Sequence, residues 1–172
     1  FNSAKKFAEF AKNKGVFTCI NLMKSYGVKS YEFTKVVKEI DSWELSDVIY
    51  LVDSAGCMSP IEIFEYIDKA KQFVKSEIGF HGHNNLSMAV ANSLQAVNSG
   101  ATYIDTCVRG MGRSAGNAQT EIVVHLLNEQ NLLKESINIY DLYDFAENTV
   151  APLMPRTQGL TVDEIHIGVS KF

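Results

Sequence analysis

The chain has 172 residues, 46% of them hydrophobic and 21% charged, and its formal net charge is −4. This length and balance predict one globular domain with a substantial core. The acidic charge gives no electrostatic reason to expect nucleic acid as a partner. No apolar run reaches the roughly 18 residues that cross a membrane, so no membrane partner is expected either.

Hydrophobic spacing alternates along the chain between the periods of helices and strands. In chain order, the predicted elements are a helix at 4–13, a strand at 16–23, a helix at 30–40, a strand at 47–52, a helix from 59 to about 75, a strand at 77–80, a helix at 86–97, a strand at 102–106, and helices at 117–129 and 139–150. Ser30 and Ser59 are predicted N-caps, and Pro60 follows Ser59 in the first helical turn. Residues 149–159 contain two prolines and are predicted to form a connection.

Four strands that are each followed by a helix predict an α/β fold with a parallel sheet and right-handed crossovers. The polar and glycine-rich segments follow the strands, which is the active face of a TIM-type (β/α) barrel or of an open sheet. A complete barrel needs about 250 residues. We therefore expect an incomplete, carboxyl-terminal portion of a barrel over residues 1–130, completed by an upstream segment or by another chain. Residues 131–172 are expected to form a helix and a connecting segment that could begin a further domain. A self-contained open sheet is the alternative.

The three cysteines, Cys19, Cys57 and Cys107, are odd in number and far apart. They fit neither a disulfide framework nor a Cys-x-x-Cys metal spacing. Each lies in or beside an apolar segment, so we expect small buried thiols in a protein of the reducing cytoplasm.

The segment His81-Gly82-His83 follows the apolar strand predicted at 77–80. Side chains alternate along a strand, so His81 and His83 face the same side and can reach one ion. Gly82 lets the backbone curve and approach a ligand. Two histidines are an incomplete metal site, because zinc or manganese takes further ligands, usually a carboxylate with water or substrate. The alternative is a pair of half-buried histidines bonded to the backbone.

Three segments together carry a family resemblance: Asp53-Ser54-Ala55-Gly56-Cys57-Met58-Ser59-Pro60, His81-Gly82-His83-Asn84-Asn85-Leu86-Ser87, and Gly110-Met111-Gly112-Arg113-Ser114-Ala115-Gly116-Asn117-Ala118. Their order and spacing, over about residues 16–128, resemble the metal-dependent barrels of pyruvate-dependent aldolases and acyl-CoA lyases and synthases. Within that superfamily, Asn84-Asn85-Leu86-Ser87 is most similar to the 4-hydroxy-2-oxovalerate aldolase branch.

The resemblance implies that His81 and His83 are metal ligands, with His81 also beside the substrate. The ion would be Mn²⁺ or Mg²⁺, with Zn²⁺ or Co²⁺ as alternatives. Asn117 would bind the substrate or lie at the metal, although a helix N-cap is an equal alternative. The family's acidic third ligand, an arginine and a histidine base belong to the first barrel strand, which would precede Phe1.

The implied reaction is reversible cleavage of a 4-hydroxy-2-oxo acid into pyruvate and an aldehyde. The chain could also form a homo-oligomer. Asn21 lies where the aldolases place a substrate-contacting polar residue, and a structural hydrogen bond is the alternative. His166 stands at the place of the aldolases' catalytic tyrosine in a faintly similar segment, and a surface histidine is the alternative.

One rival function is an acyl-CoA-dependent enzyme of the isopropylmalate synthase, homocitrate synthase or HMG-CoA lyase type. Another is a non-catalytic binding domain derived from a barrel.

Overall fold

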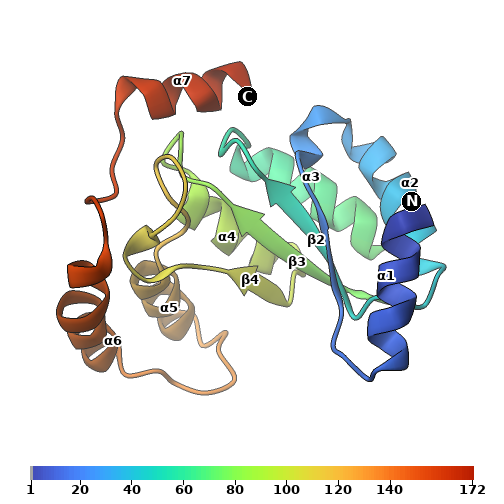
Figure 1. The fold of residues 1–172 in the computed structure, drawn as a ribbon, viewed down its shortest axis with the longest axis horizontal. Coiled ribbons are helices and arrows are strands. Elements are labelled where there is room, and N and C mark those ends of the chain that lie inside the picture. Colours follow the sequence, from blue (N-terminus) through green and yellow to red (C-terminus); the bar gives the residue numbers. More distant parts are fainter. Residues whose placement is uncertain (1) are drawn as a thin grey trace.

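The structure is a computed structural model that describes residues 2–172, and it alternates strands and helices along the chain (Figure 1). The strands are β1 (Cys19–Leu22), β2 (Val48–Asp53), β3 (Glu77–Gly82) and β4 (Tyr103–Asp105). The α-helices are α1 (Asn2–Asn13), α2 (Ser30–Asp41), α3 (Pro60–Lys71), α4 (Ala89–Asn98), α5 (Thr120–Glu129), α6 (Ile139–Phe145) and α7 (Val162–Ser170). Short helical turns are η1 (Ser25–Gly27), η2 (Val108–Gly110), η3 (Ala146–Val150) and η4 (Ala151–Leu153).

The four strands form one parallel sheet in the order β1-β2-β3-β4, which confirms the predicted α/β fold. Neighbouring strands are consecutive in the chain, as they are in a TIM-type barrel, and a full barrel has eight strands. The register places Asn21 beside Tyr50, Tyr50 beside Gly79, and Gly79 beside Tyr103. The sheet therefore corresponds to half the strands of a barrel.

The two faces of the sheet differ because side chains alternate along each strand. Ile49, Leu51, Ile78 and Phe80 are fully buried in the main core, which they share with side chains from α2, α3 and α4. The opposite face of β2 carries a separate buried cluster of Val48, Tyr50 and Val52. Tyr50 pairs with Gly79 on β3. His81 is two residues further along β3, so its side chain lies on the same face of the sheet as Tyr50.

Helix α7 was not predicted, and it lies beyond the carboxyl ends of the strands (Figure 1). Its Gly168 lies so close to the segment after β3 that an added Cβ would be 2.8 Å from Leu86 and 3.3 Å from Asn85. The capping pair Ser59 and Pro60 is confirmed at the start of α3, where the Ser59 amide donates to Glu62 at 2.8 Å. The N-cap of α2 is Lys29, one residue before the predicted Ser30.

The prediction that the cysteines are buried is wrong, because Cys19 is exposed and Cys57 and Cys107 are only half-buried. Cys19 lies on the open face of β1, opposite Ile20, which packs against the main core. The amino-acid pattern shows an apolar strand but does not show which of its faces other parts of the chain cover. Within residues 2–172, none of the helices is both long enough and apolar enough to span a bilayer.

Candidate metal and substrate site

His81 and His83 lie at the carboxyl end of β3, on and just after its last residues. Their ring centroids are 5.2 Å apart and the rings are nearly perpendicular, at 76°. His81 is in register with Asp105 on β4, and its Nδ1 lies 3.2 Å from the Asp105 Oδ2. The two imidazoles therefore converge, as the His-x-His spacing predicts.

His83 is fixed by its backbone on both sides. It forms an isolated antiparallel bridge with Asn117, and its amide donates to the Asp53 carbonyl at 3.2 Å. Burial first, and then the nearby His81 and Arg113, lower the pKa of His83 to about 4. The ring is consequently neutral at neutral pH, which is the form of imidazole that can bind a metal.

Asn117 lies beside His83 and is not the cap of the following helix. Helix α5 begins at Thr120, and its N-cap is Gln119. The Asn117 Nδ2 donates to the Met111 carbonyl at 3.1 Å and lies 3.3 Å from the Cys107 Sγ. These bonds orient the amide and leave its oxygen available.

Two buried polar atoms at this site have no hydrogen-bond partner within residues 2–172, the Nδ1 of His83 and the Oδ1 of Asn117. Buried polar atoms are almost always paired, so an unpaired nitrogen and an unpaired oxygen on two bridged residues indicate a missing ligand. An imidazole nitrogen and an amide oxygen are suitable donors for a divalent cation. The residues therefore fit a metal, although the part of the chain described has no cluster of three His, Cys, Asp or Glu side chains able to hold one.

A cavity of about 360 Å³ opens at this site. It is lined by His81, Ile104, Asp105, Thr106, Cys107 and Asn117. Its walls come from β3, β4 and the glycine-rich loop, which follow one another in the chain. The cavity is large enough for a small oxo acid.

Asn85 joins the loops around the site, and its role was not predicted from the sequence. It is fully buried, its Nδ2 donates to the Ala55 carbonyl at 3.0 Å, and its Oδ1 accepts from the Ala115 amide at 3.1 Å. Arg113 adds a second link, because its Nη2 donates to the Ser54 carbonyl at 2.6 Å. The loops after β2, β3 and β4 are thereby held together. The only sequence signal for Asn85 is its place in the motif that begins at His81.

Asp105 is the other residue that sequence reasoning missed. It is the last residue of β4 and lies within the strand predicted at 102–106, and only the register of β3 with β4 shows that it contacts His81.

The structure does not bring Asn21 or His166 into contact with the two histidines. Asn21 is exposed on β1. In the register of the sheet it is level with Gly79, two residues nearer the amino ends of the strands than His81. Its side chain has no hydrogen-bond partner among the residues described. His166 is exposed on α7. Their expected roles stay predictions.

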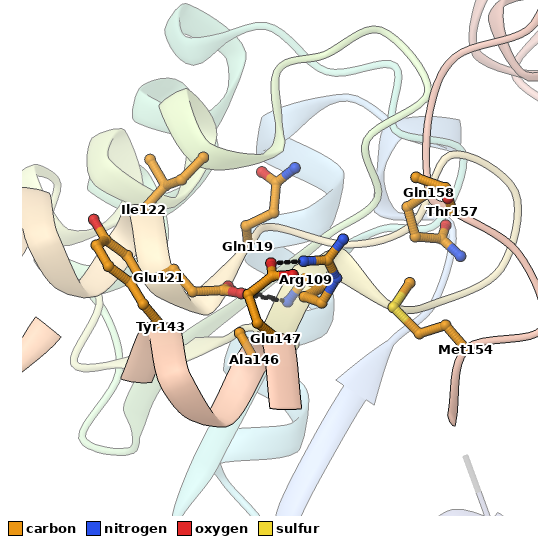
Figure 2. A pocket seen from close by; sticks show the side chains of 10 residues that line it. All are labelled: Arg109, Gln119, Glu121, Ile122, Tyr143, Ala146, Glu147, Met154, Thr157 and Gln158. Atoms are coloured by element: carbon orange, nitrogen blue, oxygen red, sulfur yellow. Dashed lines mark hydrogen bonds and ion pairs between the residues drawn. The ribbon is translucent and has the colours of Figure 1, made fainter. Parts of the chain in front are cut away.

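A second cavity, of about 530 Å³, lies between η2, the start of α5, η3 and residues 154–158 (Figure 2). Arg109 lies at its centre with left-handed backbone, φ 57°. The Arg109 amide donates to both oxygens of Glu121, at 2.8 and 3.0 Å, and its guanidinium pairs with Glu147. None of the predicted site residues lines this cavity, so it is separate from the candidate site.

Comparison with known proteins agrees with this fold and identifies the family. The HMGL-like family model matches residues 1–150, and the chain belongs to the HMGL-like family. It is 43% identical over 158 residues to a 4-hydroxy-2-oxovalerate aldolase from Geobacillus stearothermophilus, which covers 92% of this chain and 46% of that protein. It is 40% identical over 156 residues to 4-hydroxy-2-oxovalerate aldolase 2 from Rhodococcus jostii, covering 91% and 44%. The chain thus spans about half the length of the curated relatives it matches.

Solved structures show the same fold. The N-terminal domain of a candidate aldolase from Bacteroides vulgatus superposes with a TM-score of 0.84 at 26% identity, over 98% of this chain and 56% of that one. HMG-CoA lyase from Bacillus subtilis gives a TM-score of 0.72 at 22% identity, over 98% and 58%. The second likeness concerns the fold alone.

Proposed function

We propose that this chain supplies part of the active site of a divalent-metal-dependent aldolase that cleaves a 4-hydroxy-2-oxo acid into pyruvate and an aldehyde. One observation carries the proposal. His81, His83 and Asn117 converge at the carboxyl ends of parallel strands, and the His83 Nδ1 and Asn117 Oδ1 are buried there without partners. The aldolases among the chain's relatives support the choice of reaction.

HMGL-like aldolases generally depend on a divalent metal. We propose Mn²⁺ or Mg²⁺, held here by His81, by the Nδ1 of His83 and by the Oδ1 of Asn117. When bound, the ion would act as a Lewis acid on the oxo acid. The neutral His83 ring suits this task, because a protonated imidazole cannot bind a cation.

The chain's own residues would bind and orient the substrate around this point. Asn117 would contact the oxo acid from the glycine-rich loop, and Asn21 would contact it from β1. During cleavage the 4-hydroxyl loses a proton to the histidine base that the family resemblance implies, the C3–C4 bond breaks, and the pyruvate enolate takes up a proton at C3. We propose His166 as the donor of that last proton, because α7 lies beyond the carboxyl ends of the strands (Figure 1).

An acyl-CoA-dependent lyase is the alternative within the same fold. The relatives that are 40–43% identical are aldolases, whereas the HMG-CoA lyase from Bacillus subtilis is only 22% identical. Sequence similarity therefore favours the aldolase.

The test measures pyruvate release from 4-hydroxy-2-oxovalerate by the full-length protein, coupled to NADH oxidation by lactate dehydrogenase. Replacing both His81 and His83 by alanine should lower the Mn²⁺-dependent rate by about 100-fold or more, because two metal ligands are lost. His125→Ala is the matched control, since His125 is exposed on α5, and it should keep the wild-type rate. An unchanged rate and unchanged metal content in the double variant would refute the assignment.

A further inference from the structure

Asp105 places its carboxylate beside the Nδ1 of the His81 ring. The strands β3 and β4 hold the two residues in register, and the Nδ1–Oδ2 distance of 3.2 Å is that of a hydrogen bond. A neutral imidazole carries its proton on one nitrogen and a lone pair on the other. A carboxylate at Nδ1 stabilises the form with the proton on Nδ1, and the lone pair is then on Nε2.

Asp105 is itself held in place by the sheet. Tyr50, which is buried on the same face of β2, lies near enough to the Asp105 carboxylate to be affected by its charge. Burial first, and then this carboxylate, raise the pKa of Tyr50, so the phenol stays protonated. The hydrogen bond to His81 and the strand pairing of β3 with β4 together place the Asp105 carboxylate at the ring.

We propose that Asp105 is a positioning residue for His81. Asp105 fixes the tautomer and the orientation of the His81 ring that leave Nε2 free to bind the metal. The effect on the tautomer needs only the geometry of the metal-free chain. The effect on metal binding rests on the function proposed above. Carboxylates that orient a ligating histidine in this way typically change metal affinity by about 10- to 100-fold.

One rival assignment is that Asp105 binds the metal directly and that its contact with Nδ1 does not set the tautomer of His81. In that case its loss would weaken metal binding but would leave the tautomer of His81 in the metal-free protein unchanged. The two assignments therefore differ in a measurement made without metal.

The experiment uses full-length protein labelled with ¹⁵N-histidine, and compares wild type with Asp105→Ala and Asp105→Asn. Two-bond ¹⁵N–¹H correlations report the tautomer of His81 without metal, with His81→Gln used to assign its signals. Calorimetric titration with Mn²⁺ reports affinity. Asp144→Ala is the matched control, because Asp144 is exposed on α6.

We expect the Nδ1–H tautomer in wild type and in the control, and a shift toward Nε2–H in Asp105→Ala. Mn²⁺ affinity should fall by about 10- to 100-fold in Asp105→Ala. It should fall less in Asp105→Asn, because the amide oxygen can still accept a hydrogen bond from Nδ1–H. Wild-type His81 in the Nε2–H form, or a tautomer that Asp105→Ala leaves unchanged, overturns the proposal. Absence of Mn²⁺ binding by wild type would instead refute the metal site, while the tautomer result would still decide the role of Asp105.

Discussion

Gly56 lies where the loop after β2 passes against the end of β3, and its replacement by alanine should disrupt the site. An added Cβ would lie 2.6 Å from the His83 carbonyl oxygen and 2.6 Å from the Asn85 amide nitrogen. Both neighbours are backbone atoms, so neither can rotate away as a side chain could. The Gly56→Ala chain must therefore move the segment that carries His83.

The expected loss has two parts, and Gly15 separates them. Both glycines have left-handed backbone, with φ of +58° at Gly56 and +69° at Gly15, which costs about 1–2 kcal/mol for a residue with a Cβ. An added Cβ at Gly15 has no atom within 4 Å, so Gly15→Ala should lose only this part. Overpacking at Gly56 adds about 1–3 kcal/mol. We expect a total loss of about 2–5 kcal/mol for Gly56→Ala.

Urea unfolding of the two full-length variants measures these free energies, and Mn²⁺ titration measures the site. Gly56→Ala should be the less stable and should also bind Mn²⁺ more weakly, whereas Gly15→Ala should bind it as wild type does. Equal losses of stability in the two variants, with metal binding intact in both, would show that the backbone contact at Gly56 does not hold His83 in place.

Three further predictions concern buried or bonded carboxylates. Asp53→Ala removes the acceptor of the buried Met58 amide and of the half-buried Cys57 amide. It should lose about 1–3 kcal/mol in urea unfolding for the Met58 amide alone, and a loss below about 0.5 kcal/mol would contradict this. The Thr18 amide lowers the pKa of Asp47 below its ordinary value of about 3.9, so the stability that Asp47 contributes is complete above that pH and is lost as the pH falls through the lowered pKa. The stability gap between wild type and Asp47→Asn should therefore close in acid, and a gap independent of pH from 2 to 6 would be the contrary result. Glu121→Ala removes the acceptor of the Arg109 amide and should lower the free energy of unfolding by about 1–3 kcal/mol, which thermal melts that match wild type would disprove.

Much of the fold follows from local patterns in the sequence. Apolar runs of four to eight residues separated by amphipathic segments predicted all four strands and their parallel direction, because a strand followed by a helix returns to the same sheet. The start of α3 at Ser59 and Pro60 was also predictable, since a capping residue followed by proline acts locally.

The boundaries near the site were less predictable, because long-range contacts there compete with helix formation. Helix α4 begins at Ala89, three residues after the predicted start, since Asn85 bonds to two neighbouring loops. Helix α5 begins at Thr120 because Asn117 bridges to His83. In both places a polar residue that could cap a helix instead pairs with another part of the fold, and the local sequence does not show this.

The convergence of the two histidines was predictable from their spacing, whereas their surroundings were not. Asp105 is 24 residues from His81 in the chain, and only the pairing of β3 with β4 brings them together. Register between strands depends on the whole sheet, so the residue that orients a ligand is harder to find than the ligand itself.

The position of Asn85 also bears on the order of folding. Its two bonds reach 30 residues back along the chain to Ala55 and 30 residues forward to Ala115. Contacts of this span form only after the strand–helix units between them have docked, because closing such loops is entropically unfavourable until other contacts compensate. Any ligand that needs this geometry would thus bind only after three successive units have assembled. In a refolding experiment, its binding would mark the last stage of assembly and not the formation of any single unit.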